Sequence, residues 1–187
     1  MSKPLSPQEI IELDRALIEA FASHQALKRR IPAARHIKFS QLPAILAESF
    51  VIAGAGRIFG PEWKAGIGRP LSDVQLSDPT GRTRRVEVKS TGHHGFQELK
   101  DKDLLADTLV WVNFGRRYHN GHGAVQIVIL DNPGKYILES VRLDIPRLRR
   151  RVGDTPDLRQ IEVADLVDFL LSPEQQKPPD QGSLAPA

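Results

Sequence analysis

Residues 71–90 have the sequence LSDVQLSDPTGRTRRVEVKS. Apolar and polar side chains alternate in residues 71–77 and again in residues 82–90, which is the period of a half-buried β-strand. Between them, Asp78-Pro79-Thr80-Gly81 combines residue types that favour a tight turn. The segment therefore predicts a β-hairpin.

Side chains two positions apart on a strand share a face, so Glu87 and Lys89 point away from the core that receives the two valines beside them. If the turn tip is the three residues 79–81, Asp73 lies directly across from Glu87. A two-residue tip moves this pairing by one place. In either register two carboxylates and one ammonium group converge, because facing Cβ atoms lie roughly 5 Å apart.

Two neighbouring carboxylates repel each other, and a divalent cation relieves that repulsion. Oxygen ligands without cysteine or clustered histidine favour Mg²⁺, with Mn²⁺ as its substitute. A cation at Asp73 and Glu87 would also bind phosphate oxygens. Lys89 could then orient an attacking water, help to deprotonate it, or neutralise charge during phosphodiester hydrolysis.

Asp73, thirteen intervening residues and then Glu87-Val88-Lys89 resemble the PD-(D/E)xK nuclease superfamily, although Ser72 stands where that signature has proline. The resemblance covers residues 42–130, and it implies a restriction-endonuclease-like core. It also implies that Asp73 and Glu87 are metal ligands, that Lys89 is the catalytic lysine and that Glu48, on a preceding helix, is an accessory acid.

The remaining chain predicts an α/β fold, with a mixed central sheet flanked by helices. Ser6 and Glu9 form a capping box that starts an amphipathic helix over residues 6–30. The other expected elements are helices over 42–53, 96–106 and 158–171, and strands over 109–114, 124–130 and 136–138. We expect one nuclease domain over residues 1–171, with a basic, helical part over 140–171, and a disordered tail over 172–187.

The 187 residues carry a formal net charge of +3 and include no cysteine. Disulfides, cysteine-ligated zinc, iron–sulfur clusters and thiol nucleophiles are therefore excluded. No apolar run is long enough for a membrane span or a secretory signal, so the expectation is a cytoplasmic protein with no membrane partner. A phosphate-binding loop pattern is also absent, which argues against a nucleotide cofactor.

Basic side chains occur in clusters, and arginine pairs well with phosphate oxygens. We expect double-stranded DNA as the partner, with contacts from Lys28, Arg29, Arg30, Arg82, Arg84, Arg85, Arg116 and Arg117. Further basic residues are Arg35, Lys38, Arg147 and Arg149 to Arg151.

Several polar residues have simpler interpretations. Asp78 competes with Asp73 as the first acid, but an Asp before Pro is explained by its turn. Gln97 and Lys100 suit a solvated helix face. The histidine pairs at 93–94 and at 119 and 122 fit loops better than a metal site. Glu87 and Lys89 could themselves be an ordinary charged strand face.

The expected activity is that of a Mg²⁺-dependent DNA endonuclease, most simply a type II-like restriction enzyme. A small chain with one active site cuts both strands most simply as a homodimer, for which the helices at 6–30 and 158–171 offer surfaces. The alternatives are a non-catalytic DNA-binding protein or a subunit of a larger nuclease or defence complex. A third possibility is a repair or RNA nuclease.

Overall fold

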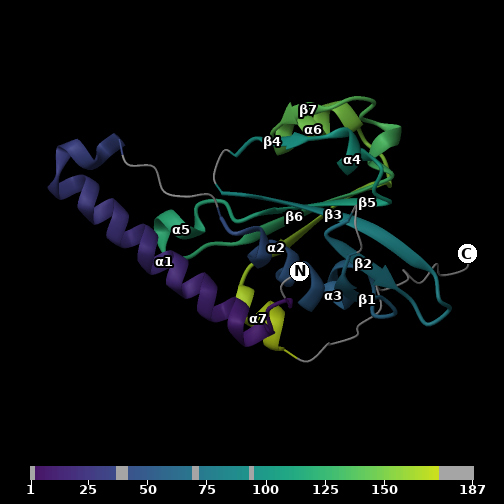
Figure 1. The fold of residues 1–187 in the computed structure, drawn as a ribbon, viewed down its shortest axis with the longest axis horizontal. Coiled ribbons are helices and arrows are strands. Elements are labelled where there is room, and N and C mark those ends of the chain that lie inside the picture. The colour runs from purple at the N-terminus through teal and green to yellow at the C-terminus, as the bar shows by residue number, and fades with distance from the viewer. Residues whose placement is uncertain (1–2, 37–41, 69–71, 93–94, 173–187) are drawn as a thin grey trace, which may run out of the picture.

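The computed structural model describes residues 3–36, 42–68, 72–92 and 95–172. Within these ranges the chain is an α/β protein built on a six-stranded mixed sheet, as predicted (Figure 1). Only β3 and β5 are parallel neighbours in this sheet. In spatial order the strands are β1 (Lys64–Ile67), β2 (Val74–Ser77), β3 (Thr83–Thr91), β5 (Thr108–Asn113), β6 (Val125–Asp131) and β8 (Leu158–Val163).

Helices cover one face of the sheet and a smaller mixed layer covers the other (Figure 1). On the first face lie α1 (Pro7–Arg30), α2 (Ala44–Ala53), α3 (Ala55–Phe59), α5 (Arg117–Asn120) and α7 (Leu166–Leu171). On the second lie α4 (Asp101–Leu104), α6 (Ile145–Val152) and a two-stranded sheet of β4 (Gln97–Leu99) and β7 (Val141–Leu143). Two short 3₁₀ helices, η1 (Pro32–His36) and η2 (Pro133–Lys135), complete the elements of the described residues.

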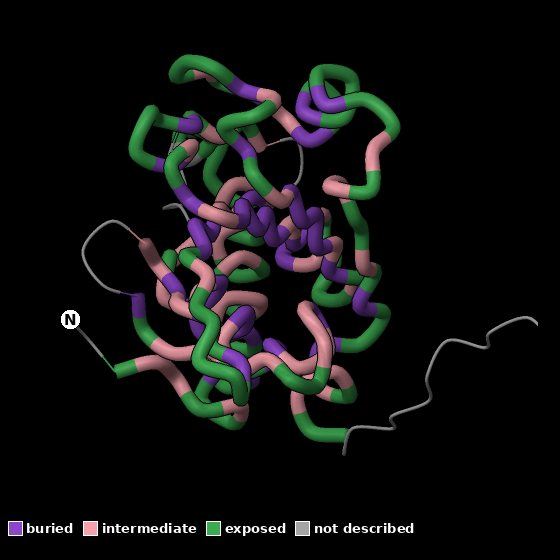
Figure 2. Tube along the Cα trace, turned by 90° about the vertical axis from the view of Figure 1, so that its right-hand side faces the viewer, coloured by how far each residue is buried: buried purple, intermediate pink, exposed green. Residues whose placement is uncertain are grey.

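Each layer has its own apolar core, and alternating side chains of the central strands supply both. Val110 and Val112 of β5 belong to the first core, whereas Leu109 and Trp111 belong to the second. Because both faces are covered, β5 is buried along nearly its whole length. Figure 2 shows the buried segments gathered in the middle of the molecule.

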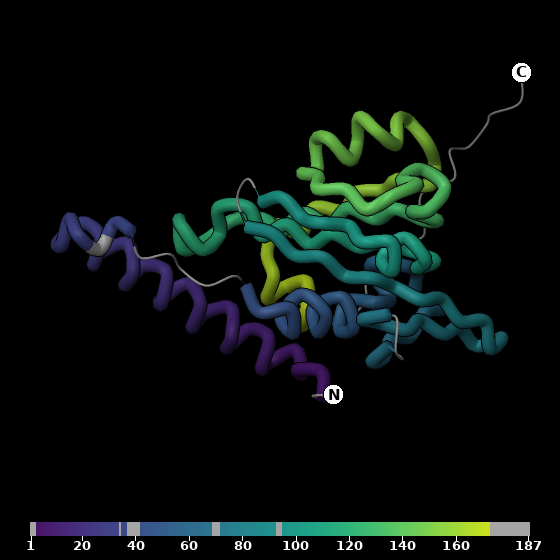
Figure 3. The backbone as a smooth tube through the Cα atoms, turned by 45° about the horizontal axis from the view of Figure 1, so that its top comes forward, coloured from purple at the N-terminus to yellow at the C-terminus, as the bar shows by residue number. Residues whose placement is uncertain are grey.

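The predicted amphipathic helix is confirmed as α1. The Ser6 hydroxyl oxygen accepts the Glu9 N–H, and the Glu9 carboxylate accepts the Ser6 N–H, so both halves of the capping box form. Figures 1 and 3 show the C-terminal half of α1 and η1 extending past the rest of the fold. The helix expected over 42–53 is confirmed as α2, which ends at Gly54.

The hairpin is also confirmed, and its register is the first of the two that the sequence leaves open. Val74 pairs with Val86 and Ser77 with Thr83, which is the register that a three-residue tip produces. The Asp78 N–H donates to Arg82 O at 3.0 Å and closes the turn. Val86 and Val88 enter the first core, so Glu87 and Lys89 face the second layer.

The predictions of a helix over 96–106 and a strand over 136–138 were wrong. Residues 96–106 do not form one helix: they form β4 and the single turn of α4, because Gln97–Leu99 finds a strand partner in β7. No strand covers 136–138 either. That segment follows η2 and a left-handed Asn132, and the nearby strand is β7.

The helix expected over 158–171 was also wrong in its first half. Residues 158–163 form β8, which pairs antiparallel with β6 along the edge of the sheet. Tertiary pairing overrides a weak local preference here, since β6 would otherwise expose its backbone groups. Only α7 is helical, and Asp165 caps it.

No helix among the described residues combines the length and the apolar character needed to cross a membrane. The expected tail lies outside the described residues except for Ser172.

Candidate active site

The site begins where β2 separates from β3. The last paired residue of β2 on this side is Val74, opposite Val86, while β3 continues to Thr91. Beyond Val86 the backbone groups of β3 on the β2 side therefore lose their strand partner. Asp73 fills the opening: its Oδ2 accepts the Val88 N–H at 2.8 Å.

The backbone of Asp73 is held from both sides. Its N–H donates to Val86 O at 3.1 Å, and its carbonyl oxygen accepts the Gly68 N–H at 3.0 Å. A Cβ on Gly68 would lie 2.1 Å from the backbone oxygen of Ser72, so only glycine permits this approach. The position of Asp73 thus depends on the end of β1 as well as on β3.

Glu87 and Lys89 lie side by side on the face that carries the second layer, next to Leu109 and Trp111 of β5. Lys89 Nζ donates to Glu87 Oε1 at 2.6 Å. Glu87 is only 4% exposed. A nearly buried carboxylate needs such a partner because burial disfavours its charge.

A second acid, Asp103 of α4, holds the other side of the lysine. Its Oδ2 lies 2.8 Å from Lys89 Nζ and accepts the Lys100 N–H at 2.9 Å. Asp103 is 1% exposed. Sequence reasoning missed this residue because it placed residues 96–106 in one helix. The only local signal was an acid three residues after Lys100, a spacing typical of a helix cap.

Glu48 reaches the same region from the opposite face of the sheet. It interrupts the apolar α2, four of whose side chains are buried in the first core: Leu46, Ala47, Phe50 and Val51. Burial, and next the negative charge of Asp73, raise the pKa of Glu48 above its ordinary value. Glu48 and Asp73 therefore lie close enough to repel each other.

These side chains line one cleft of about 510 Å³. Its walls come from α2, from the second half of β3 and from the segment that leads into β4. The structure thus brings together the four predicted residues Glu48, Asp73, Glu87 and Lys89, and Lys102 contributes a further cation to the lining.

The electrostatics of Glu87 follow from this crowding. Burial raises the pKa of Glu87 to about 7; the hydrogen bond from Lys89 opposes that shift and the charge of Asp73 adds to it. For Lys89, burial lowers the pKa, but the hydrogen bonds to Asp103 and Glu87 outweigh burial and leave the pKa above its ordinary value. Lys89 is therefore an ammonium group at neutral pH. It can orient a water or neutralise charge, but it cannot accept a proton.

The carboxylate oxygens of this site are the kind of ligand that Mg²⁺ prefers. Among the described residues no three His, Asp or Glu side chains are grouped so as to hold an ion by themselves. Asp73 uses Oδ2 for the Val88 N–H, whereas Glu87 accepts Lys89 at Oε1 and also shares a side-chain hydrogen bond with Asp103. A cation would bind Asp73 through Oδ1, and it would replace the proton that Glu87 shares with Asp103. Mg²⁺ commonly takes one or two carboxylates and completes its shell with water and phosphate oxygens. The residues fit that pattern.

The three arginines of the hairpin already have partners in the fold. Arg82 pairs with Asp78 at 2.6 Å, Arg85 with Asp107 at 3.4 Å and Arg84 with Asp131 at 3.6 Å. Arg82 and Arg84 also lie over the Trp63 ring. All three side chains keep substantial exposed area.

Arg117 differs from these arginines because it is an internal ion-pair partner. It donates from Nε and Nη2 to the Asp14 carboxylate, at 2.9 and 2.7 Å, and from Nη1 to Gly123 O. Only 12% of its side chain is exposed. We therefore leave Arg117 out of the nucleic-acid surface, whereas its neighbour Arg116 is exposed.

The helix α1 carries Lys28, Arg29 and Arg30 in its last turn, on the part that extends past the sheet (Figure 3). The turn interpretation of Asp78 is confirmed. Its carboxylate accepts Thr80 and Arg82, and these hydrogen bonds, that of the Thr80 hydroxyl first, lower its pKa to about 2.

Gln97 and the histidines lie outside the hairpin, and the structure describes some of them. Gln97 lies on β4, not on a helix, and donates to Ser90 O. His119 and His122 are exposed. Lys38, His93 and His94 lie outside the described residues.

No protein-family model matches this chain, and neither does any curated protein or solved structure. Membership of the PD-(D/E)xK superfamily therefore remains a prediction from the motif.

Proposed function

We propose that this chain is a Mg²⁺-dependent phosphodiester hydrolase that acts on DNA and has a restriction-endonuclease-like core. One observation carries the proposal: Asp73, Glu87 and Lys89 converge on a cleft at the point where β2 leaves β3. Fully charged, this group of acids costs free energy, and a bound cation would offset that cost and allow a phosphate to approach.

In this proposal the acidic residues bind the ion and the lysine acts on the water and the phosphate. Asp73 and Glu87 would hold Mg²⁺ through the oxygens that face the cleft, and the ion would supply positive charge to the scissile phosphate. Lys89, an ammonium held by two acids, would orient the attacking water and neutralise charge as the water oxygen bonds to phosphorus and the bond to the leaving sugar oxygen breaks. Glu48 would support a ligand of the ion or accept a proton released by the water.

Restriction-type cleavage of both strands of a duplex is achieved most simply by two such sites, and we expect a homodimer for that purpose. Repair or RNA cleavage would use the same chemistry on a differently shaped substrate. The cleavage pattern separates these roles: discrete fragments indicate a sequence-specific endonuclease, whereas nicking or smearing indicates repair or nonspecific degradation.

The test is cleavage of supercoiled plasmid with Mg²⁺, Mn²⁺ or EDTA by the full chain and by Asp73→Asn and Lys89→Met. Asp154→Asn and Lys64→Met, which change exposed residues outside the cleft lining, are matched controls. We expect metal-dependent cleavage that both site variants lose and both controls keep. A wild type that retains DNA in a gel shift without cutting it would overturn the proposal in favour of a binding protein.

Metal binding is checked separately from activity. Mg²⁺ that binds the folded state raises the melting temperature of the wild type, and Asp73→Asn should lose that rise. An equal rise in both proteins would show that the ion binds elsewhere.

A further inference from the structure

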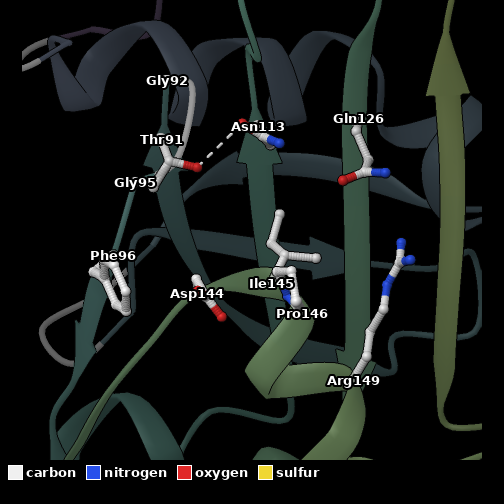
Figure 4. Close-up of a pocket in the computed structure, with 10 residues that line it drawn as sticks. All are labelled: Thr91, Gly92, Gly95, Phe96, Asn113, Gln126, Asp144, Ile145, Pro146 and Arg149. Carbon is white, nitrogen blue, oxygen red and sulfur yellow. Dashed lines mark hydrogen bonds between the residues drawn. The ribbon is translucent and has the colours of Figure 1, made fainter.

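A second pocket of about 440 Å³ adjoins the acid cleft. Both are lined by Thr91, Gly92, Gly95 and Phe96, so a ligand can extend from one into the other. Figure 4 shows that the pocket lies over the ends of β3, β5 and β6, between Phe96 on one side and the first turn of α6 on the other.

The floor of this pocket is a row of polar side chains across three strands. Thr91 pairs with Asn113 and Asn113 pairs with Gln126, so the register places them side by side on the face that carries Lys89. Trp111 Nε1 donates to Thr91 Oγ1 at 2.9 Å and fixes the edge of the row. The apolar side of α6 packs over the next row, which leaves the amides at the pocket (Figure 4).

The orientation of Asn113 is set by the protein. Its Oδ1 accepts the Thr91 hydroxyl at 3.3 Å and the Gly115 N–H at 3.1 Å. Its amide nitrogen therefore faces the Gln126 side, as Figure 4 shows. Side-chain amides at a fixed orientation suit the donor and acceptor edge of a nucleobase.

An aromatic ring with arginine neighbours forms one wall. Phe96 is 40% exposed, and the guanidinium carbons of Arg142 and Arg147 lie 5.7 and 5.1 Å from its ring centroid. Exposed aromatic rings beside cations are the usual platform for unpaired bases and their phosphates. A fully paired duplex offers no free base face to such a ring.

The first turn of α6 forms the opposite wall, and its charges favour a base inside the pocket and phosphates at the rim. Asp144 caps α6 by accepting the Arg147 N–H at 2.8 Å, and its carboxylate repels a phosphate there. A carboxylate does accept hydrogen bonds from the exocyclic amino group of a base. Arg147 is exposed on the same helix, and Arg149 lines the pocket and donates to Gln160 of β8.

We propose that this pocket binds an unpaired nucleobase of the strand whose phosphate lies in the acid cleft. The preferred substrate would then be DNA with a single-stranded or extruded nucleotide beside the scissile bond. This inference rests on the proposed function, because it takes the acid cleft as the place of the phosphate.

The test measures binding in Mg²⁺ without cleavage, by fluorescence anisotropy, because every protein in it carries Lys89→Met, which we expect not to cut DNA. The probes are one paired duplex, the same duplex with one bulged base, and that duplex with an abasic bulge. We expect the full chain to bind the base-bearing bulge about ten-fold more tightly than the abasic bulge, which is the size of one base stacked on one aromatic ring. Phe96→Ala and Gln126→Ala should each reduce this ratio and keep the affinity for the paired duplex.

The control is Arg150→Ala on the exposed face of α6 outside the pocket lining, which should weaken all three probes alike. Equal affinity of the Lys89→Met chain for base-bearing and abasic bulges, or no binding to any probe, would overturn the inference. Cleavage of plasmid in Mg²⁺ is scored independently. If the protein cuts DNA but binds base-bearing and abasic bulges equally, the pocket does not bind a base. The proposed hydrolase function is then unaffected.

Discussion

Lys89 places its ammonium group 2.8 Å from the carboxylate of Asp103, a residue that belongs to a different element and lies fourteen positions further along the chain. Lys89 also pairs with Glu87, so the cation is clamped between two nearly buried acids. The clamp keeps the charge of Lys89 and its direction constant, and it makes Asp103 a positioning residue in the proposed site.

Asp103→Asn tests this clamp. Loss of one hydrogen bond to a charged group should reduce cleavage about ten-fold and lower the pKa of Lys89, because the opposing effect of burial remains. The alkaline limb of the pH–rate profile should then move to lower pH. Asp101→Asn, a neighbouring exposed acid on α4, is the control and should leave the profile unchanged. An unshifted profile in Asp103→Asn would make Asp103 merely structural.

Glu87→Gln should separate stability from function. The pKa of Glu87 is raised to about 7 in the fold from an ordinary value of 4.5, so the folded state binds more protons than the unfolded state between these pH values. The contribution of Glu87 to stability is therefore greatest below pH 4.5 and is lost as the pH rises through 7.

Relative to the wild type, Glu87→Gln should gain about 1–3 kcal/mol in unfolding free energy between pH 4.5 and pH 8, and it should not cut DNA. Denaturant titrations at the two pH values measure the gain. A difference between variant and wild type that stays constant with pH would contradict the raised pKa.

Gly68→Ala tests how Asp73 is placed. The new Cβ would collide with the Ser72 backbone oxygen, so the segment that carries Asp73 must move. We expect at least a ten-fold loss of cleavage, since small displacements of catalytic groups are costly. Gly66→Ala is the matched control, because a Cβ there meets nothing within 4 Å. Equal activity of the two variants would show that Gly68 does not position the site.

Arg117→Ala distinguishes an internal ion pair from a nucleic-acid contact. Removing Arg117 leaves the nearly buried Asp14 without its partner, which should cost about 3–5 kcal/mol of stability. Arg116→Ala changes an exposed neighbour and should leave stability within about 0.5 kcal/mol. Thermal melts of both variants decide the matter. If Arg117→Ala binds DNA more weakly but melts at an unchanged temperature, Arg117 contacts DNA and is not mainly an internal ion-pair partner.

The local signals that succeeded share one property: their partners are close in sequence. The capping box at Ser6 and Glu9 and the hairpin turn at residues 78–81 are satisfied within a few residues. Short segments such as 97–99 and 158–163 failed because their conformation depends on a distant strand partner, which no local pattern reveals.

The candidate site divides in the same way. The sequence by itself determined the hairpin and the shared face of Glu87 and Lys89, because a period of two fixes which side chains share a face. The structure selected the three-residue tip, and with it the register. Only the tertiary structure decided that Asp103 clamps Lys89, that Glu48 meets Asp73 across the open sheet and that Arg117 is an internal partner of Asp14. Those relationships join residues from separate elements, and the packing of the layers alone brings such residues into contact.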